Sequence, residues 1–121
     1  MFNSELDENY LNSMYDLILE NQSFLIEVVS RYAPKFDIEN MDLSYIIPIF
    51  IAMTEMLLLP EEIPAKVSIN EAVEISKVYG DDSSRKMVNG VLNKVLNDLE
   101  NVQSDLKIFD KNTSVKIIFK R

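Results

Sequence analysis

The stretch IPAKVSINEAVEISKVYGDDSSRKMVNGVLNKV, residues 63–95, contains two helix-forming segments separated by one strong break. On both sides of the break, apolar residues recur every three to four positions, and this spacing predicts amphipathic α-helices. Gly80 suits the C-cap of the first helix, and the DDSS that follows it supplies an N-cap and acidic side chains for the positive end of the second helix dipole. We therefore predict one helix over about Ala65 to Tyr79 and another over about Ser83 to Val102, hinged at Gly80.

The first of these helices has an apolar side and a polar side. At 100° per residue the apolar side carries Ile69, Ala72, Val73, Ile75, Ser76 and Tyr79, and the opposite side carries Lys66, Asn70, Glu74 and Lys77. The pattern indicates that only the first side packs against the rest of the protein.

The second helix places one of the chain's two glycines on its outward side. Its core stripe consists of Val88, Val91, Leu92, Val95, Leu96 and Leu99. Gly90 lies nearly opposite this stripe, Lys86, Met87, Asn93 and Lys94 lie beside the glycine, and Asn89 lies nearer the core edge. Glycine inside a helix costs about 1 kcal/mol relative to alanine, so this position calls for an explanation.

Two explanations fit the outward glycine. A bare stretch of backbone between lysines and an exposed methionine suits a nucleic acid, because lysines pair with phosphates and the thioether can lie against a base. Alternatively, Met87 and Gly90 contact another helix or the tail of the same protein. The pattern of residues leaves both explanations open.

Composition favours a single all-α domain. The chain has 121 residues, 47% of them hydrophobic, with only two glycines and four prolines to make the turns of a sheet. It has no cysteine and no histidine, so disulfides, thiol nucleophiles, the usual zinc sites and the commonest general base are excluded. We expect no enzymatic activity, no metal and no cofactor.

Three further helices are predicted upstream. The first begins near Ser4 and extends to Asn21, and the second extends from about Ser23 to Tyr32, just before Pro34. The third ends at Leu59, has Pro48 in its first turn, and is apolar nearly all round, which is typical of a central buried helix.

The end of the chain changes character. Residues 107–121 lose helical periodicity and gain β-branched and basic side chains. We therefore predict a helical domain over residues 1–103 and a tail over 104–121, irregular or with a short strand. The tail contains apolar residues able to cover exposed core, namely Ile108, Phe109, Val115, Ile117, Ile118 and Phe119.

Charge is distributed unevenly along the sequence. Residues 1–62 carry 12 acidic and 2 basic side chains, whereas residues 63–121 carry 8 acidic and 10 basic ones, within an overall net charge of −8. An acidic surface suits a basic protein partner, and the second half tolerates a phosphate backbone. The first ten residues lack the apolar segment of a signal peptide, and the apolar run Ile46 to Leu59 is too short for a bilayer, so a cytoplasmic protein is expected.

Residues 63–95 resemble the C-terminal half of the NusB family of bacterial transcription antitermination proteins, and the upstream FIAMTEMLLL is similar to that family's buried helix. The resemblance extends over about residues 11–98. It implies an all-helical fold and a non-enzymatic role: binding the boxA element of ribosomal-RNA leader transcripts together with NusE, a small-subunit ribosomal protein, within an RNA polymerase antitermination complex.

The resemblance also implies which residues contact RNA. Lys86, Asn89 and Gly90 match the family motif, Asp82 and Ser83 match its Asp-Ser, and Met87 stands where the family has a phenylalanine associated with RNA. With Lys94, which lies on the same outward side, the predicted RNA-binding residues are Lys86, Met87, Asn89, Gly90 and Lys94.

One departure from the family affects the RNA prediction. The family usually opens with an arginine-rich segment that grips RNA, whereas residues 1–30 here contain no lysine or arginine. Because phosphate contacts supply most of the affinity for RNA, we expect weak binding by this chain alone. The alternative is a protein-only interaction module that keeps the NusE-type docking surface, and a homodimer is a further assembly that the sequence leaves open.

Overall fold

The computed structural model describes residues 4–59 and 63–109. All the secondary structure in these two ranges is helical. The elements in chain order are α1 (Ser4–Tyr32), a short 3-10 helix η1 (Ile38–Asn40), α2 (Leu43–Leu58), α3 (Ala65–Tyr79), α4 (Asp82–Asn97) and α5 (Leu99–Ile108). The predicted all-α class is confirmed, because the described residues contain no strand.

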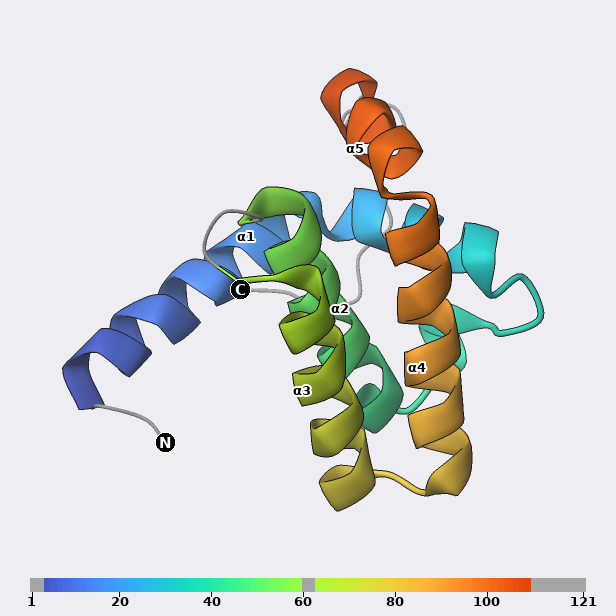
Figure 1. Ribbon diagram of the computed structural model, residues 1–121, viewed down its shortest axis with the longest axis horizontal. Helices are drawn as coiled ribbons and strands as arrows, with labels where there is room; N and C mark the ends of the chain where they lie inside the picture. The colour runs from blue at the N-terminus through green and yellow to red at the C-terminus, as the bar shows by residue number, and fades with distance from the viewer. Residues whose placement is uncertain (1–3, 60–62, 110–121) are drawn as a thin grey trace.

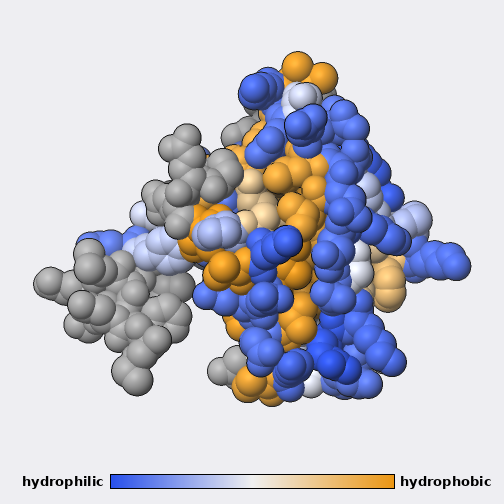
Figure 2. All heavy atoms as spheres, viewed as in Figure 1, coloured by the Kyte–Doolittle hydropathy of each residue, from blue (hydrophilic) through white to orange (hydrophobic). Residues whose placement is uncertain are grey.

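Helix α2 forms the centre of the core. Ile47 is exposed and Ile51 is partly buried, but the other side chains from Pro48 to Leu57 are buried, as expected for a helix that is apolar nearly all round. It packs most extensively against α3 and α4, which lie side by side and run in opposite directions in front of it in Figure 1. Figure 2 shows an apolar band down the middle of this face with hydrophilic atoms on both sides.

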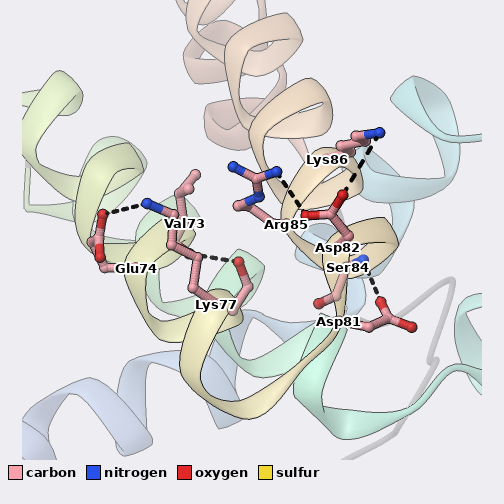
Figure 3. Close-up of polar contacts among 9 residues, drawn as sticks. Val73, Glu74, Lys77, Asp81, Asp82, Ser84, Arg85 and Lys86 are labelled. Atoms are coloured by element: carbon pink, nitrogen blue, oxygen red, sulfur yellow. Dashed lines mark hydrogen bonds and ion pairs between the residues drawn. The ribbon is translucent and has the colours of Figure 1, made fainter.

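The turn between α3 and α4 follows the prediction. The backbone N–H of Gly80 donates to the carbonyl of Ser76 at 2.9 Å and closes α3. Asp81 is the N-cap of α4, and its Oδ1 accepts a hydrogen bond from the backbone N–H of Ser84 at 2.8 Å (Figure 3). Gly80 has an extended backbone (φ −122°, ψ −168°), so the glycine is required by space: a Cβ there would lie 2.5 Å from Ser84 Oγ and 2.9 Å from the Ser76 carbonyl oxygen.

The predicted break between two N-terminal helices is wrong, because α1 is continuous from Ser4 to Tyr32. Asn21 and Gln22, in the middle of this helix, are both buried in the protein. Their amide groups donate to the carbonyls of Leu17 at 2.9 Å and Leu19 at 3.4 Å, so both side chains are satisfied without a change in direction. The first turns of α1 project outward from the other helices (Figure 1), but the hydroxyl of Tyr10 in this half of the helix donates a hydrogen bond to Glu55 of α2.

Helix α2 begins at Leu43, so Pro48 lies inside it and not in its first turn as predicted. The carbonyl of Asp42 accepts hydrogen bonds from the backbone N–H groups of Tyr45 at 3.0 Å and Ile46 at 3.4 Å, and these bonds start the helix. Pro48 contributes no N–H and so removes one bond near the start of a helix whose packing compensates for it.

The predicted long helix from Ser83 to Val102 is also interrupted. Helix α4 ends at Asn97 and α5 begins at Leu99, with Asp98 in a non-helical conformation between them (φ −117°, ψ 24°). The Asp98 carboxylate accepts hydrogen bonds from the hydroxyl of Tyr32 and, at 2.6 Å, from the side-chain amide of Asn101. These side-chain bonds favour a change of direction at Asp98 over a continuous helix.

Helix α5 extends past residue 104, where the tail was expected to begin, and ends at Ile108. Phe109 lies edge-on to Phe24, with ring centroids 5.1 Å apart, so this apolar tail residue does pack against the core. Ile108, by contrast, is 81% exposed. The other apolar tail residues and the predicted strand lie outside the described residues, and the division into a domain and a tail stays a prediction.

Candidate nucleic-acid interface

A recess lies between α4 and the turn that follows α1. Its volume is about 360 Å³, and it is lined by Tyr32, Ala33, Pro34, Lys35, Phe36, Lys86, Met87, Gly90, Val91 and Lys94. Four of the five predicted RNA-binding residues therefore lie together, and residues 86, 90 and 94 occupy the same side on successive turns of α4.

The turn Ala33–Phe36 forms the wall opposite α4. The backbone N–H of Ala33 donates to the Val29 carbonyl at 2.7 Å, and the N–H of Phe36 donates back to the Ala33 carbonyl at 3.1 Å. Pro34 occupies the second position of this turn, where its fixed φ is favourable. As a result, Lys35 and Phe36 are exposed at the edge of the recess.

Gly90 faces open space, as predicted. A Cβ built at this position has no heavy atom within 4 Å, so no neighbour within the described residues requires a glycine there. Among the described residues, packing therefore does not explain Gly90, and its bare backbone forms an accessible part of the recess wall.

Met87 was predicted to be exposed, and this is wrong: only 8% of it is accessible. The wheel for α4 places Met87 away from the main core stripe, but the turn after α1 lies over that side of the helix. The alternative explanation, a contact within the same protein, is therefore correct for Met87, which contributes to the wall of the recess and not to an exposed contact surface.

Both predicted lysines of α4 are exposed. Lys86 Nζ lies 3.9 Å from Asp82 Oδ2, but the two side chains are 75% and 73% exposed, so the pair is weak (Figure 3). Asp82 also pairs with Arg85 at 2.7 Å. Lys94 Nζ donates to the backbone carbonyl of Tyr32 at 3.4 Å, which holds this ammonium group at the recess without neutralising it.

Asn89 does not lie at the core edge as predicted. It is exposed, and its backbone carbonyl and side-chain Oδ1 accept hydrogen bonds from the Asn93 amide at 2.8 and 2.9 Å. It does not line the recess. Asp82 and Ser83 are exposed at the start of α4.

The charged residues that line the recess are all lysines: Lys35, Lys86 and Lys94. This gathering of one sign of charge occurs on a chain with a net charge of −8. A local positive surface on an acidic protein attracts anions and keeps the acidic remainder away from them.

Tyr32 holds the end of α1 at the edge of this recess. Burial raises the pKa of Tyr32, and its hydrogen bond to Asp98 raises it further. The same bond, with that from Asn101, lowers the pKa of Asp98. An ion pair of 2.7 Å between Arg31 and Asp105 joins the end of α1 to α5 beside it.

Comparison with known proteins agrees with this fold. The sequence model of the NusB family matches residues 2–97. The chain belongs to the NusB family. It is 39% identical over 83 residues to the transcription antitermination protein NusB of Nitratidesulfovibrio vulgaris, covering 69% of this chain and 50% of that protein. It is 37% identical over 86 residues to the NusB of Bacillus licheniformis, covering 69% of this chain and 64% of that protein.

A further NusB, from Bacillus thuringiensis, is 34% identical over 91 residues, covering 75% of this chain and 69% of that protein. The chain spans about half the length of the relatives from Nitratidesulfovibrio vulgaris and Oleidesulfovibrio alaskensis. The residues that line the recess all lie within the NusB family match. No solved structure gave a significant match to the chain.

Lys35 and Phe36 are the recess residues that the sequence did not identify. They stand in the APKF connector, where Pro34 indicates the end of a helix and nothing indicates a contact with α4. A lysine and an aromatic residue in a proline turn are a weak signal that becomes informative only once the turn is placed beside Gly90.

Within the described ranges, no helix has both the length and the apolar character that a membrane span requires.

Proposed function

We propose that this NusB-family chain is a non-enzymatic transcription antitermination factor of the cytoplasm that binds single-stranded boxA-type leader RNA. It does so together with NusE, the small-subunit ribosomal protein, and the pair joins RNA polymerase to support transcription of ribosomal RNA. The observation that carries the proposal is the recess in which Lys35, Lys86 and Lys94 surround the bare backbone of Gly90. The similar proteins from other bacteria are named transcription antitermination proteins, and this supports a role for the chain in antitermination.

The chemistry of the recess suits an RNA strand. Ammonium groups pair with phosphates, and the release of counterions makes such binding depend on salt, with a slope of about −0.7 per neutralised phosphate for single strands. Three lysines then give a slope of about −2, a shallow dependence and a modest affinity. A second RNA-binding surface held nearby by NusE raises the effective concentration and so strengthens binding.

The test is fluorescence anisotropy of a labelled boxA-type RNA with the chain alone and with cognate NusE. Lys86→Glu should abolish binding in the NusE mixture, because it reverses one of the three recess charges. Lys77→Glu is the matched control: it makes the same charge change on α3, where Lys77 pairs with Glu74 at 3.0 Å outside the recess. Equal losses for both variants would show a general effect of net charge and would contradict the proposal.

A protein-only interaction module is the second candidate function. The balance of 12 acidic and 2 basic side chains in residues 1–62 favours it, since an acidic surface attracts a basic ribosomal protein. Calorimetric titration with NusE at low and moderate salt measures this docking independently of RNA. Binding of NusE without any RNA affinity in the mixture would support the second candidate, and no heat at either salt concentration would count against NusE docking.

A further inference from the structure

We propose that Phe36 supplies the stacking surface for one unpaired RNA base in the recess, and that Lys35 contacts a phosphate next to that base. The inference rests on the proposed RNA-binding function and specifies how the site holds its ligand. The sequence indicated α4 alone as the RNA-binding element. The geometry points to a two-sided site, with α4 on one side and the Ala33–Phe36 turn on the other.

The first observation is the exposure of Phe36. It is 46% accessible, although phenylalanine is among the most often buried residue types. A single exposed apolar side chain is common on protein surfaces and needs no function. Phe36, however, lines the recess with Lys35, Lys86 and Lys94. An exposed ring beside these lysines can contact the base of a nucleotide whose phosphate the lysines bind.

The second observation is that Met87 is buried. The methionine at the family's aromatic position is 8% exposed and offers little surface to a base. Among the described residues that line the recess, Phe36 is the only phenylalanine, and Tyr32, the other aromatic residue, has its hydroxyl bonded to Asp98. The aromatic surface available to a ligand is therefore on the turn and not on α4.

The third observation is the way the turn is held. The hydrogen bond between the Phe36 N–H and the Ala33 carbonyl fixes the backbone at the ring, and Pro34 limits the conformations of the turn. The carboxylate of the next residue, Asp37, accepts a hydrogen bond from Asn40 at 2.5 Å within its own loop and does not line the recess. The carboxylate of Asp37 therefore does not compete with an RNA phosphate for Lys35.

These features together favour an unpaired nucleotide as the ligand of the recess. Bases stack on aromatic rings whatever their identity, and basic side chains follow the adjoining phosphates. A recess of about 360 Å³ is at the small end of ligand pockets and suits one base, not a duplex. The missing side chain at Gly90 leaves the backbone of α4 open to close approach from the other side.

The chain has no tryptophan, and this allows a direct test. Phe36→Trp places the chain's single tryptophan in the recess, where it can be excited separately from the tyrosines. We expect this variant to bind boxA-type single-stranded RNA at least as tightly as the parent chain and to lose tryptophan emission on saturation. Tyr15→Trp is the control, because Tyr15 has the same 46% exposure on α1, and its emission should not change. Both variants are used as full 121-residue chains, alone and with cognate NusE.

The affinity measurement uses Phe36→Leu, which keeps an apolar side chain but removes the ring. We expect RNA affinity to fall between about 5-fold and about 150-fold, the range for loss of one base stack, with an unchanged salt slope because no charge is altered. Tyr15→Leu should bind as the parent does. Melting temperatures of the parent and Phe36→Leu should agree closely, which separates the loss of stacking from a loss of folding.

Four results would overturn the inference. If Phe36→Leu binds RNA like the parent, or if the emission of the Phe36→Trp variant is unchanged at saturation, stacking is absent while the proposed function stands. If Phe36→Leu weakens binding of inorganic polyphosphate as much as that of RNA, the residue shapes an anion site and does not stack. If the parent itself binds no RNA with NusE present, the proposed function fails and the inference fails with it.

Discussion

The hydroxyl of Tyr32 donates a hydrogen bond to the carboxylate of Asp98, and this bond ties the last residue of α1 to the junction of α4 and α5. The two residues are 66 positions apart in the sequence. The turn at Ala33–Phe36 begins immediately after Tyr32, so the bond also sets where this turn lies relative to α4. A bond from Tyr32, which lines the recess, to Asp98, which does not, thereby positions one wall of the recess.

Removing this hydrogen bond should loosen the recess. Tyr32→Phe keeps the ring and deletes the hydroxyl, so the melting temperature should fall by a few degrees and RNA affinity should fall with it. Phe36→Leu gives the contrasting pattern, lower affinity at an unchanged melting temperature. An unaltered melting temperature for Tyr32→Phe would show that the bond does not stabilise the fold.

The same pair predicts how stability depends on pH. The pKa of Asp98 in the folded chain is lowered from its ordinary value of 3.8, mainly by the bond from Tyr32, so its contribution is present above that value and is lost as the pH falls through the folded pKa. The pKa of Tyr32 is raised from 10.0, mainly by burial, so its contribution is present below pH 10.0 and is lost as the pH rises through the folded pKa.

Chemical unfolding across the pH range measures both limits. In the parent chain, stability should decline at acid pH below about 4 and again above about 10. In Tyr32→Phe the alkaline decline should be smaller, because the titrating hydroxyl is gone. An alkaline decline of equal size in the variant would assign it to other groups.

The two glycines should respond in opposite ways to substitution. Gly90→Ala should stabilise the chain by up to about 1 kcal/mol, because the position is helical, faces open space and gains helix propensity. Gly80→Ala should destabilise it by about 1–3 kcal/mol, because the new Cβ meets Ser84 Oγ at 2.5 Å and the Ser76 carbonyl oxygen at 2.9 Å. Urea denaturation of both variants decides the comparison.

A larger side chain at the exposed glycine separates fold from function. Gly90→Gln should fold with a melting temperature equal to or above that of the parent, yet block the close approach of RNA to α4 in the NusE mixture. Asn93→Gln on the same helix, outside the recess, serves as the control and should bind RNA normally. Normal binding by Gly90→Gln would show that the bare backbone is not part of the contact.

A buried carboxylate in the central helix gives a prediction about stability alone. Glu55 is 3% exposed and accepts a hydrogen bond from the hydroxyl of Tyr10, which connects α2 to the first half of α1. Tyr10→Phe leaves a buried acceptor without this donor, and the free energy of unfolding should fall by roughly 1–3 kcal/mol. RNA affinity per folded molecule should not change, because neither residue lines the recess.

Much of the α3–α4 hairpin follows from neighbouring residues alone. The stop at Gly80, an N-cap within DDSS and the buried stripe of Val88, Val91, Leu92 and Val95 are local properties of spacing and side-chain chemistry. The structure confirms each of them and shows that the cap is Asp81. The outward position of Gly90 follows from the same periodicity. These features depend on residues within a few helical turns of one another.

The sequence by itself therefore determined the helical class, the hairpin and the lysines beside Gly90, whereas the tertiary structure decided which side chains remain accessible there. Met87 is buried and Phe36 is exposed because the turn after α1, which is distant in the chain, lies on α4. The break at Asp98 likewise depends on a hydroxyl from Tyr32. Helical periodicity reports which side of a helix is apolar, but it carries no information about a distant segment that packs on the other side.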